Sequence, residues 1–127
     1  MSFVIRTDFS DEGAWDRLCR AIRTPSPDFG FLANVEFVND RRHENATPDA
    51  LVAEATDSES LLFVADRVAL AHSELPILAV YYFDTPYATV RVIPSELWGI
   101  ENNISLGNMD FEEFVENAGP DGIFRGF

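Results

Sequence analysis

The sequence predicts a mixed α/β domain: a mostly parallel sheet of about five strands with an antiparallel edge hairpin, packed by about three to four helices. Apolar segments alternate with amphipathic segments through the first half of the chain, as expected for strands joined by helical crossovers. Two apolar runs around residue 85 are separated by a tight turn, which predicts a hairpin. Hydrophobic residues make up 46% of the 127 residues, enough for a core.

The predicted strands are apolar segments bounded by turn residues. They are Phe3–Arg6, Phe31–Val38, Leu61–Ala65, Ile77–Phe83 and Thr89–Ile93. The third of these is an unbroken apolar run, which indicates a strand buried on both faces of the sheet. The last two flank the turn at residues 84–87 and are expected to pair as the hairpin.

The clearest predicted helix follows the first strand. Ser10 is its expected N-cap, and a stripe of apolar residues at helical spacing continues to Ile22. The helix should end before the Thr24-Pro25-Ser26-Pro27 loop, since proline disfavours helical geometry in the residue before it. A second, short helix is expected from Pro48 to about Ala55, with Thr47 as its cap.

The C-terminal part predicts a short helix over residues 95–101, which Gly99 weakens, and then a well-signalled last helix. Asp110 and Glu113 form a capping-box pattern, and Gly119-Pro120 ends the helix. Whether the Asn-rich residues between these helices are loop or helix stays open. The apolar tail Ile123–Phe127 is expected to dock on the domain. No repeat or linker divides the chain, so residues 1–127 are predicted to form one domain.

Composition excludes several functions. The net charge is −13, and all nine basic residues are arginine. Such a chain repels phosphate backbones, which argues against nucleic-acid partners; the charge would suit a basic protein partner, and it is equally explained by a role in solubility alone. No apolar run approaches the ~18 residues of a membrane span, and the N-terminus does not resemble a secretory signal, so a cytoplasmic location without membrane contact is expected. Cys19 is the single cysteine, which leaves no internal disulfide.

One candidate site lies at the ends of the predicted strands. Asp8, Asp40, Asp66 and Asp84 each follow a strand closely. Ligands of open α/β sheets bind beyond the carboxyl ends of the strands, and gathered carboxylates are suitable ligands for Mg²⁺. Aspartate is also a common turn and cap residue, which would explain the same pattern. The metal-site hypothesis therefore names Asp8, Asp40 and Asp66, with Asp84 at the hairpin turn.

A second candidate site lies in the stretch before the last helix. It consists of Glu96, Trp98, Glu101, Asn102 and Asn103. Asparagine amides both donate and accept hydrogen bonds, so a pair of them beside an aromatic ring is suited to bind a small ligand or a peptide backbone. The same amides could instead satisfy the backbone of a turn.

Both ends of the chain resemble a known family. The segments VIRTDFSDEGAWDRL and VIPSELWGIENNISLGNMDFEEF, together with the closing DGIFRGF, are similar to small acidic bacterial proteins, frequent in actinobacteria, that are classed as a domain of unknown function. The resemblance implies a one-domain fold. It implies no activity, cofactor or catalytic residue.

Two functions follow as hypotheses. The first, which small size, charge and the absence of catalytic motifs favour, is a non-enzymatic acidic protein-binding module of the inhibitor or immunity type, without a cofactor. The alternative is a small metal-dependent enzyme or metal-binding domain that uses the strand-end aspartates and Mg²⁺. An oligomer formed through Tyr81, Tyr82 and Tyr87 of the hairpin is not distinguished from the first hypothesis. An exposed aromatic patch ringed by carboxylates would favour the binding module.

Overall fold

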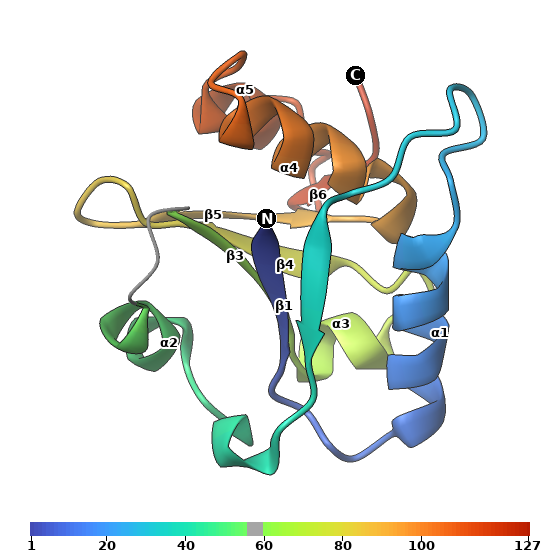
Figure 1. Ribbon diagram of the computed structural model, residues 1–127, viewed down its shortest axis with the longest axis vertical. Coiled ribbons are helices and arrows are strands. Elements are labelled where there is room, and N and C mark those ends of the chain that lie inside the picture. Colours follow the sequence, from blue (N-terminus) through green and yellow to red (C-terminus); the bar gives the residue numbers. More distant parts are fainter. Residues whose placement is uncertain (56–59) are drawn as a thin grey trace.

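The computed structural model describes residues 1–55 and 60–127 (Figure 1). These residues form one six-stranded sheet with the order β2-β1-β3-β4-β5-β6. The strands are β1 (Ser2–Arg6), β2 (Val35–Val38), β3 (Leu61–Ala65), β4 (Ile77–Tyr81), β5 (Ala88–Val92) and β6 (Ile123–Phe124). β1 is parallel to β2 and to β3, whereas β4 is antiparallel to both of its neighbours. The predicted class, a mixed and mostly parallel α/β domain, is confirmed.

The predicted hairpin forms, with Ala79 opposite Val90 in the β4–β5 pair. It does not lie at the edge of the sheet, however, because β6 pairs in parallel with β5 through Ile123 and Phe124. The C-terminal tail therefore docks, as expected, and does so as a strand. A run of two residues is too short to be recognised as a strand from its pattern.

Helices cover the two faces of the sheet unequally (Figure 1). The larger core cluster includes residues of α1 (Glu12–Arg23), α3 (Arg67–Ala71), α4 (Leu97–Ser105) and α5 (Phe111–Glu116). The smaller cluster, on the other face, includes Leu51 of α2 (Pro48–Glu54). All five residues of β3 are buried between them, as its apolar run predicts. Short 3-10 turns, η1 (Arg41–His43) and η2 (Pro94–Glu96), precede α2 and α4.

Two of the predicted helix caps are confirmed and one is wrong. Thr47 accepts a hydrogen bond from the Ala50 amide, and the Asp110–Glu113 capping box is complete. For α1 the cap is Asp11, whose Oδ1 accepts from the Ala14 amide at 3.0 Å. Ser10 instead donates its hydroxyl to Asp8 at 2.8 Å. Both residues are good caps, so the sequence pattern could not choose between them.

The two largest differences from the predicted boundaries are at the start of β2 and the end of α4. β2 begins at Val35, since Phe31 bonds back to Ser26 through both its amide and its carbonyl and so belongs to the preceding loop. α4 extends to Ser105 and so contains part of the Asn-rich stretch. Gly99 does not interrupt this helix. Among the described residues, no helix has the length and apolar character needed to cross a membrane.

Candidate functional site

The strand-end aspartates have local partners. β1, β2 and β3 are parallel, so Asp8, Asp40 and Asp66 follow strands that end at the same edge of the sheet. Asp8 accepts from the amide and hydroxyl of Ser10, and Asp40 caps η1 through the Arg42 amide. In residues 1–55 and 60–127, no three His, Cys, Asp or Glu side chains are grouped so that they could hold a metal ion. The Mg²⁺ site stays a prediction without geometric support.

Asp66 is the most constrained of these carboxylates. Its Oδ1 accepts from the Ala69 amide at 3.0 Å and thereby caps α3. Both of its oxygens also accept from the guanidinium of Arg91, at 2.9 and 2.7 Å. A bidentate arginine pair of this kind holds the carboxylate in one orientation. Asp66 therefore links β3, α3 and β5, which is a structural role.

The residues of the second candidate site separate into two groups. Glu96, Trp98 and Asn103 line one cavity of about 820 Å³. Glu101 is 1% exposed and accepts hydrogen bonds from Ser2, Asn34 and Ser105, so it connects α4 to the start of β1 and to the loop before β2. We call this cavity, whose lining includes the exposed residues Phe29 and Phe127, the aromatic groove.

Asn102 and Asn103 do not act as a pair. Asn103 donates its amide to the carbonyl of Gly99 at 2.7 Å, one helical turn earlier, while lining the groove. Asn102 is half-buried and does not line this cavity. The helical geometry explains the separation, because consecutive residues of a helix point about 100° apart.

One wall of the aromatic groove is the loop between α1 and β2. Ser26 closes this loop by hydrogen bonds to both backbone groups of Phe31, at 2.9 and 3.0 Å. Gly30, with a φ of +71°, allows the turn. The closed loop places Phe31 against Trp98, with ring centroids 4.8 Å apart, and Phe29 against Phe31 at 5.6 Å. Prolines on both sides of Ser26 restrict the loop further.

The C-terminal tail forms the opposite wall. Phe127 packs on Phe124 and Phe114, with centroid distances of 5.0 and 5.4 Å. Gly126 has a φ of +109°, and a Cβ there would lie 3.3 Å from Oε1 of Glu96. The tail can pass this close to Glu96 because residue 126 is glycine. Phe29 and Phe127 remain 68% and 74% exposed, so aromatic surface is open to solvent on both sides of the groove.

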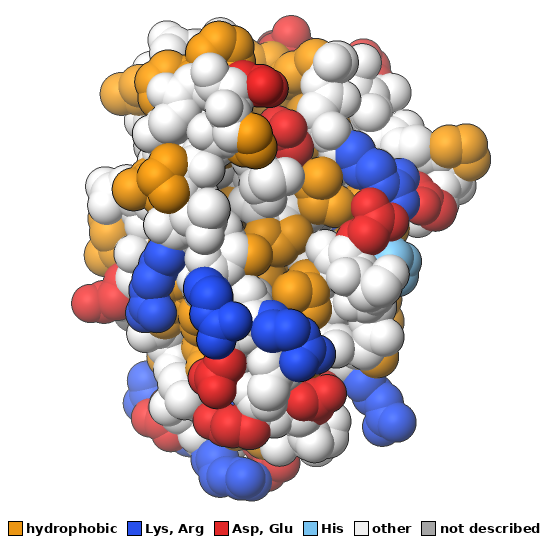
Figure 2. All heavy atoms as spheres, turned by 90° about the vertical axis from the view of Figure 1, so that its right-hand side faces the viewer, with side chains coloured by type: hydrophobic (Ala, Val, Ile, Leu, Met, Phe, Trp, Pro, Cys, Tyr) orange, Lys and Arg blue, Asp and Glu red, His pale blue; other side chains and the backbone are white. Residues whose placement is uncertain are grey.

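The charges around the groove are mostly negative. Asp28, Glu96 and Glu113 line it. Arg125, the one cation among the described residues that line the groove, is already bound by Glu74 at 2.9 Å and by Asp121 at 2.7 Å. The hydrogen bonds from Arg125 lower the pKa of both carboxyl groups. In Figure 2, hydrophobic side chains gather in the upper part of the α1 side of the molecule, whereas arginines cross its lower half.

Two polar groups of the groove are poorly satisfied. Burial, and then the nearby charge of Asp28, raise the pKa of Glu96. The indole Nε1 of Trp98 is buried and has no acceptor among the described residues. Buried polar groups of folded proteins are nearly always hydrogen-bonded, so an exception of this kind marks a place where an incoming acceptor would be stabilising.

Replacing Glu96 with glutamine should raise the free energy of unfolding at pH 7, by about 0.5 kcal/mol or less. Because the pKa of Glu96 is raised, its contribution to stability is fully present below its unfolded-state pKa and is lost as the pH rises through the folded-state pKa. The variant should therefore have a higher free energy of unfolding than the unchanged protein near pH 7. Near about pH 3.5 the two proteins should be equally stable, because the carboxyl is mostly protonated in both the folded and the unfolded state. Urea unfolding at both pH values measures this. An equal increase in the free energy of unfolding at both pH values would contradict a raised pKa of Glu96.

Fold and site define a single-domain mixed α/β protein with an acid-rimmed aromatic groove. A family model described as "Domain of unknown function (DUF6924)" matches residues 1–127, so the chain belongs to this family. The resemblance to a domain of unknown function is thereby confirmed. No curated protein and no solved structure gives a significant match to the chain.

Sequence reasoning missed Phe29 and placed no site in the loop around it. Asp28-Phe29-Gly30 has no recognisable function as a motif. A signal was present in the sequence, because three large apolar residues, Phe29, Phe31 and Leu32, closely follow the loop-forming Pro25 and Pro27. The structure shows that all three are exposed. Apolar residues gathered in a constrained loop are typical of a binding surface.

Proposed function

We propose that this protein is a non-enzymatic protein-binding module whose aromatic groove takes a segment of a partner that carries an aromatic or large aliphatic side chain between arginines or lysines. The observation that carries the proposal is the pair of exposed rings, Phe29 and Phe127, on the two sides of a groove lined by three carboxylates. The proposal takes the cytoplasm as the compartment in which the partner is met.

The apolar part of the groove supports an anchor side chain. Its aromatic walls come from the loop and from the tail, and both are held by packing and by hydrogen bonds. A cavity of about 820 Å³ is ample for one large side chain and its backbone. Aromatic side chains in well-packed pockets contribute most of the binding free energy at many interfaces.

The charges support a basic partner. Asp28, Glu96 and Glu113 line the groove, and the exposed residues Glu112 and Glu116 lie on the same short helix as Glu113. Neither of the last two has an ion-pair partner among the described residues. Arginine or lysine beside the anchor would pair with these carboxylates, and the net charge of −13 would speed the encounter.

The test is selection of a randomised peptide library against the immobilised protein. We expect the selected peptides to combine an aromatic or large aliphatic residue with arginine or lysine. Their affinity should fall as NaCl is raised from about 50 mM to about 500 mM, because salt screens exposed charges. The Phe29→Ser/Phe127→Ser double variant should bind them at least about tenfold more weakly.

The matched control is Phe83→Ser, which removes a phenylalanine that is 71% exposed and does not line the groove. It should bind the selected peptides as the unchanged protein does. Selection of peptides without cationic residues, or equal loss of affinity in the control and in the double variant, would refute the proposal. Thermal melts of all variants show whether each is folded.

A further inference from the structure

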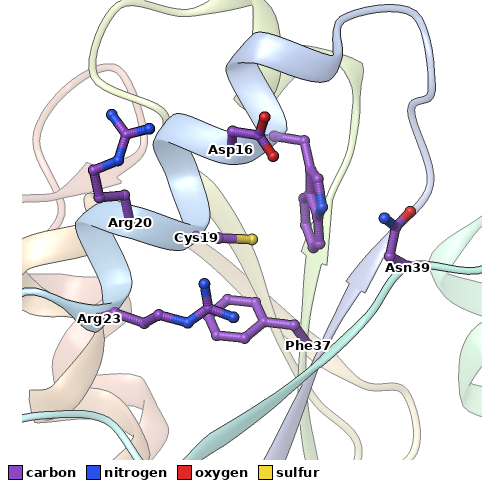
Figure 3. A pocket seen from close by; sticks show the side chains of 7 residues that line it. Asp16, Cys19, Arg20, Arg23, Phe37 and Asn39 are labelled. Atoms are coloured by element: carbon purple, nitrogen blue, oxygen red, sulfur yellow. The ribbon is translucent and has the colours of Figure 1, made fainter.

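A second cavity, on a different part of the molecule, has the opposite charge. It lies between α1 and the edge strand β2 and has a volume of about 470 Å³ (Figure 3). Trp15, Cys19 and Phe37 give it apolar walls, and Arg20, Arg23 and Asn39 add polar groups. Asp16 is the single carboxylate among its lining residues. Although the chain has 22 acidic and nine basic residues, arginines outnumber carboxylates among the described residues that line this cavity.

The two arginines of this cavity have no carboxylate partner in the part of the chain that the structure describes. Ion pairs occupy Arg6, Arg41, Arg42, Arg91 and Arg125. Among the described residues, neither Arg20 nor Arg23 forms one, despite the excess of carboxylates. The guanidinium of Arg23 lies 4.5 Å from the centroid of the Phe37 ring, which holds it beside the cavity. Its N–H groups are therefore available to an anion.

A buried cation lies behind the wall of the cavity. Arg6 is 1% exposed and donates to Oδ1 of Asn39 at 3.3 Å. This hydrogen bond orients the amide of Asn39, so its nitrogen faces the α1 side in Figure 3 and is a further donor to the cavity. Arg6 also pairs with Glu12 at 2.8 Å, which offsets part of its charge, while its Nη2 is buried without an acceptor.

The apolar walls restrict what the anion can be. Trp15 is 4% exposed and meets Phe37 edge to face, with centroids 6.1 Å apart. Cys19 is buried, and this burial raises the pKa of its thiol to about 11, so the sulfur is neutral at pH 7 and adds no negative charge. A hydrated inorganic ion would gain nothing from these walls. An organic anion with an apolar body would use both parts of the cavity.

We propose that the cavity between α1 and β2 binds a small organic carboxylate. Its carboxylate is held by the guanidinium of Arg23 beside Phe37 and by that of Arg20, whose side chain points away from Cys19 in Figure 3 and turns toward the cavity when the ligand binds. The amide of Asn39 lies across the cavity as a further donor, and the apolar body of the ligand lies against Trp15, Cys19 and Phe37. Arginine suits this ligand because its planar fork donates two parallel hydrogen bonds to a carboxylate. Asp16 on the rim disfavours ligands with several negative charges. The proposal is independent of the aromatic groove.

The chain offers a direct readout. It contains two tryptophans, and Trp98 lies in the aromatic groove, so the Trp98→Phe variant reports on Trp15 alone. Its emission is followed while cyclohexanecarboxylate, which does not absorb at the excitation wavelength, is added. We expect a saturable change with a Kd of the order of 1 mM, in keeping with about nine non-hydrogen atoms. The neutral analogue cyclohexanecarboxamide should bind at least about tenfold more weakly.

Variants in the same Trp98→Phe background assign the site. Arg20→Gln/Arg23→Gln should weaken carboxylate binding at least about tenfold. The control Arg17→Gln removes another exposed arginine of α1 that does not line the cavity, and it should bind normally. No saturable change, equal binding of the carboxamide, or equal loss in the control would overturn the proposal. Inorganic phosphate binding as tightly as the carboxylate would overturn it too, since the apolar body would then contribute nothing.

Discussion

Replacing Glu101 with alanine should lower the free energy of unfolding by about 3 kcal/mol. The carboxylate is 1% exposed and accepts from the hydroxyls of Ser2 and Ser105, at 3.2 and 2.6 Å, and from the amide of Asn34 at 3.0 Å. Without it, donors from three segments lose their acceptor, among them the buried hydroxyl of Ser2, and a cavity is left at the position of the carboxylate. Urea unfolding followed by circular dichroism measures the change.

The control for this prediction is Glu112→Ala. Glu112 is exposed on α5, so its loss should change the free energy of unfolding by less than about 0.5 kcal/mol. The second serine partner offers a further check: Ser105→Ala should lose less than Glu101→Ala, since two acceptor contacts of Glu101 remain. Similar stabilities for the Glu101 and Glu112 variants would show that the hydrogen bonds from Ser2 and Asn34 do not hold α4 to the rest of the domain.

Replacing Phe124 with alanine should lower the free energy of unfolding by about 4 kcal/mol. Phe124 is 1% exposed, lies in β6 opposite Val92, and meets Phe114 of α5 edge to face with centroids 5.2 Å apart. Truncation removes one of the largest buried side chains and the contact that joins β6 to α5. Thermal and urea unfolding both report the loss.

The tail supplies its own control in Phe127→Ala. This ring contacts Phe114 and Phe124 but is 74% exposed, so its removal should cost about 1 kcal/mol or less. The two neighbouring phenylalanines are thus expected to differ in role: Phe124 in stability and Phe127 in peptide binding. Equal destabilisation by Phe124→Ala and Phe127→Ala would contradict the arrangement in which Phe124 is buried and Phe127 is exposed.

Local signals predicted the framework well. The unbroken apolar run of Leu61–Ala65 became a strand buried on both faces, and the Asp110–Glu113 pattern became a complete capping box. Signals of this kind depend on neighbours within a few residues, so contacts with distant segments of the chain do not change the structures that they predict. The choice between Ser10 and Asp11 as the cap of α1 failed for the complementary reason, because Asp8 engages Ser10 and the pattern could not show it.

The site was less predictable, because its parts are distant in the chain. Glu96, Trp98 and Asn103 line the groove as expected. Glu101 was grouped with them, yet its partner Ser2 lies 99 residues away, and no local pattern shows such a contact. The expected gathering of Asp8, Asp40 and Asp66 followed from strand direction. Strand direction does not predict the hydrogen bonds in which each carboxylate takes part as a cap or in a turn.

Three arginines lie on α1 and three glutamates on α5, so the charge of the molecule is unevenly distributed and it has an electric dipole in addition to its net charge. The field of another molecule exerts a torque on this dipole. Near a basic surface the protein should therefore rotate so that α5 faces that surface before contact. A small anion is repelled by the net charge of −13 at long range and is attracted only close to the arginines of α1. Salt screens exposed charges beyond about 8 Å at physiological strength, so raising the salt concentration should slow association with a basic partner but should not slow that of a small anion, because it also screens the repulsion by the net negative charge.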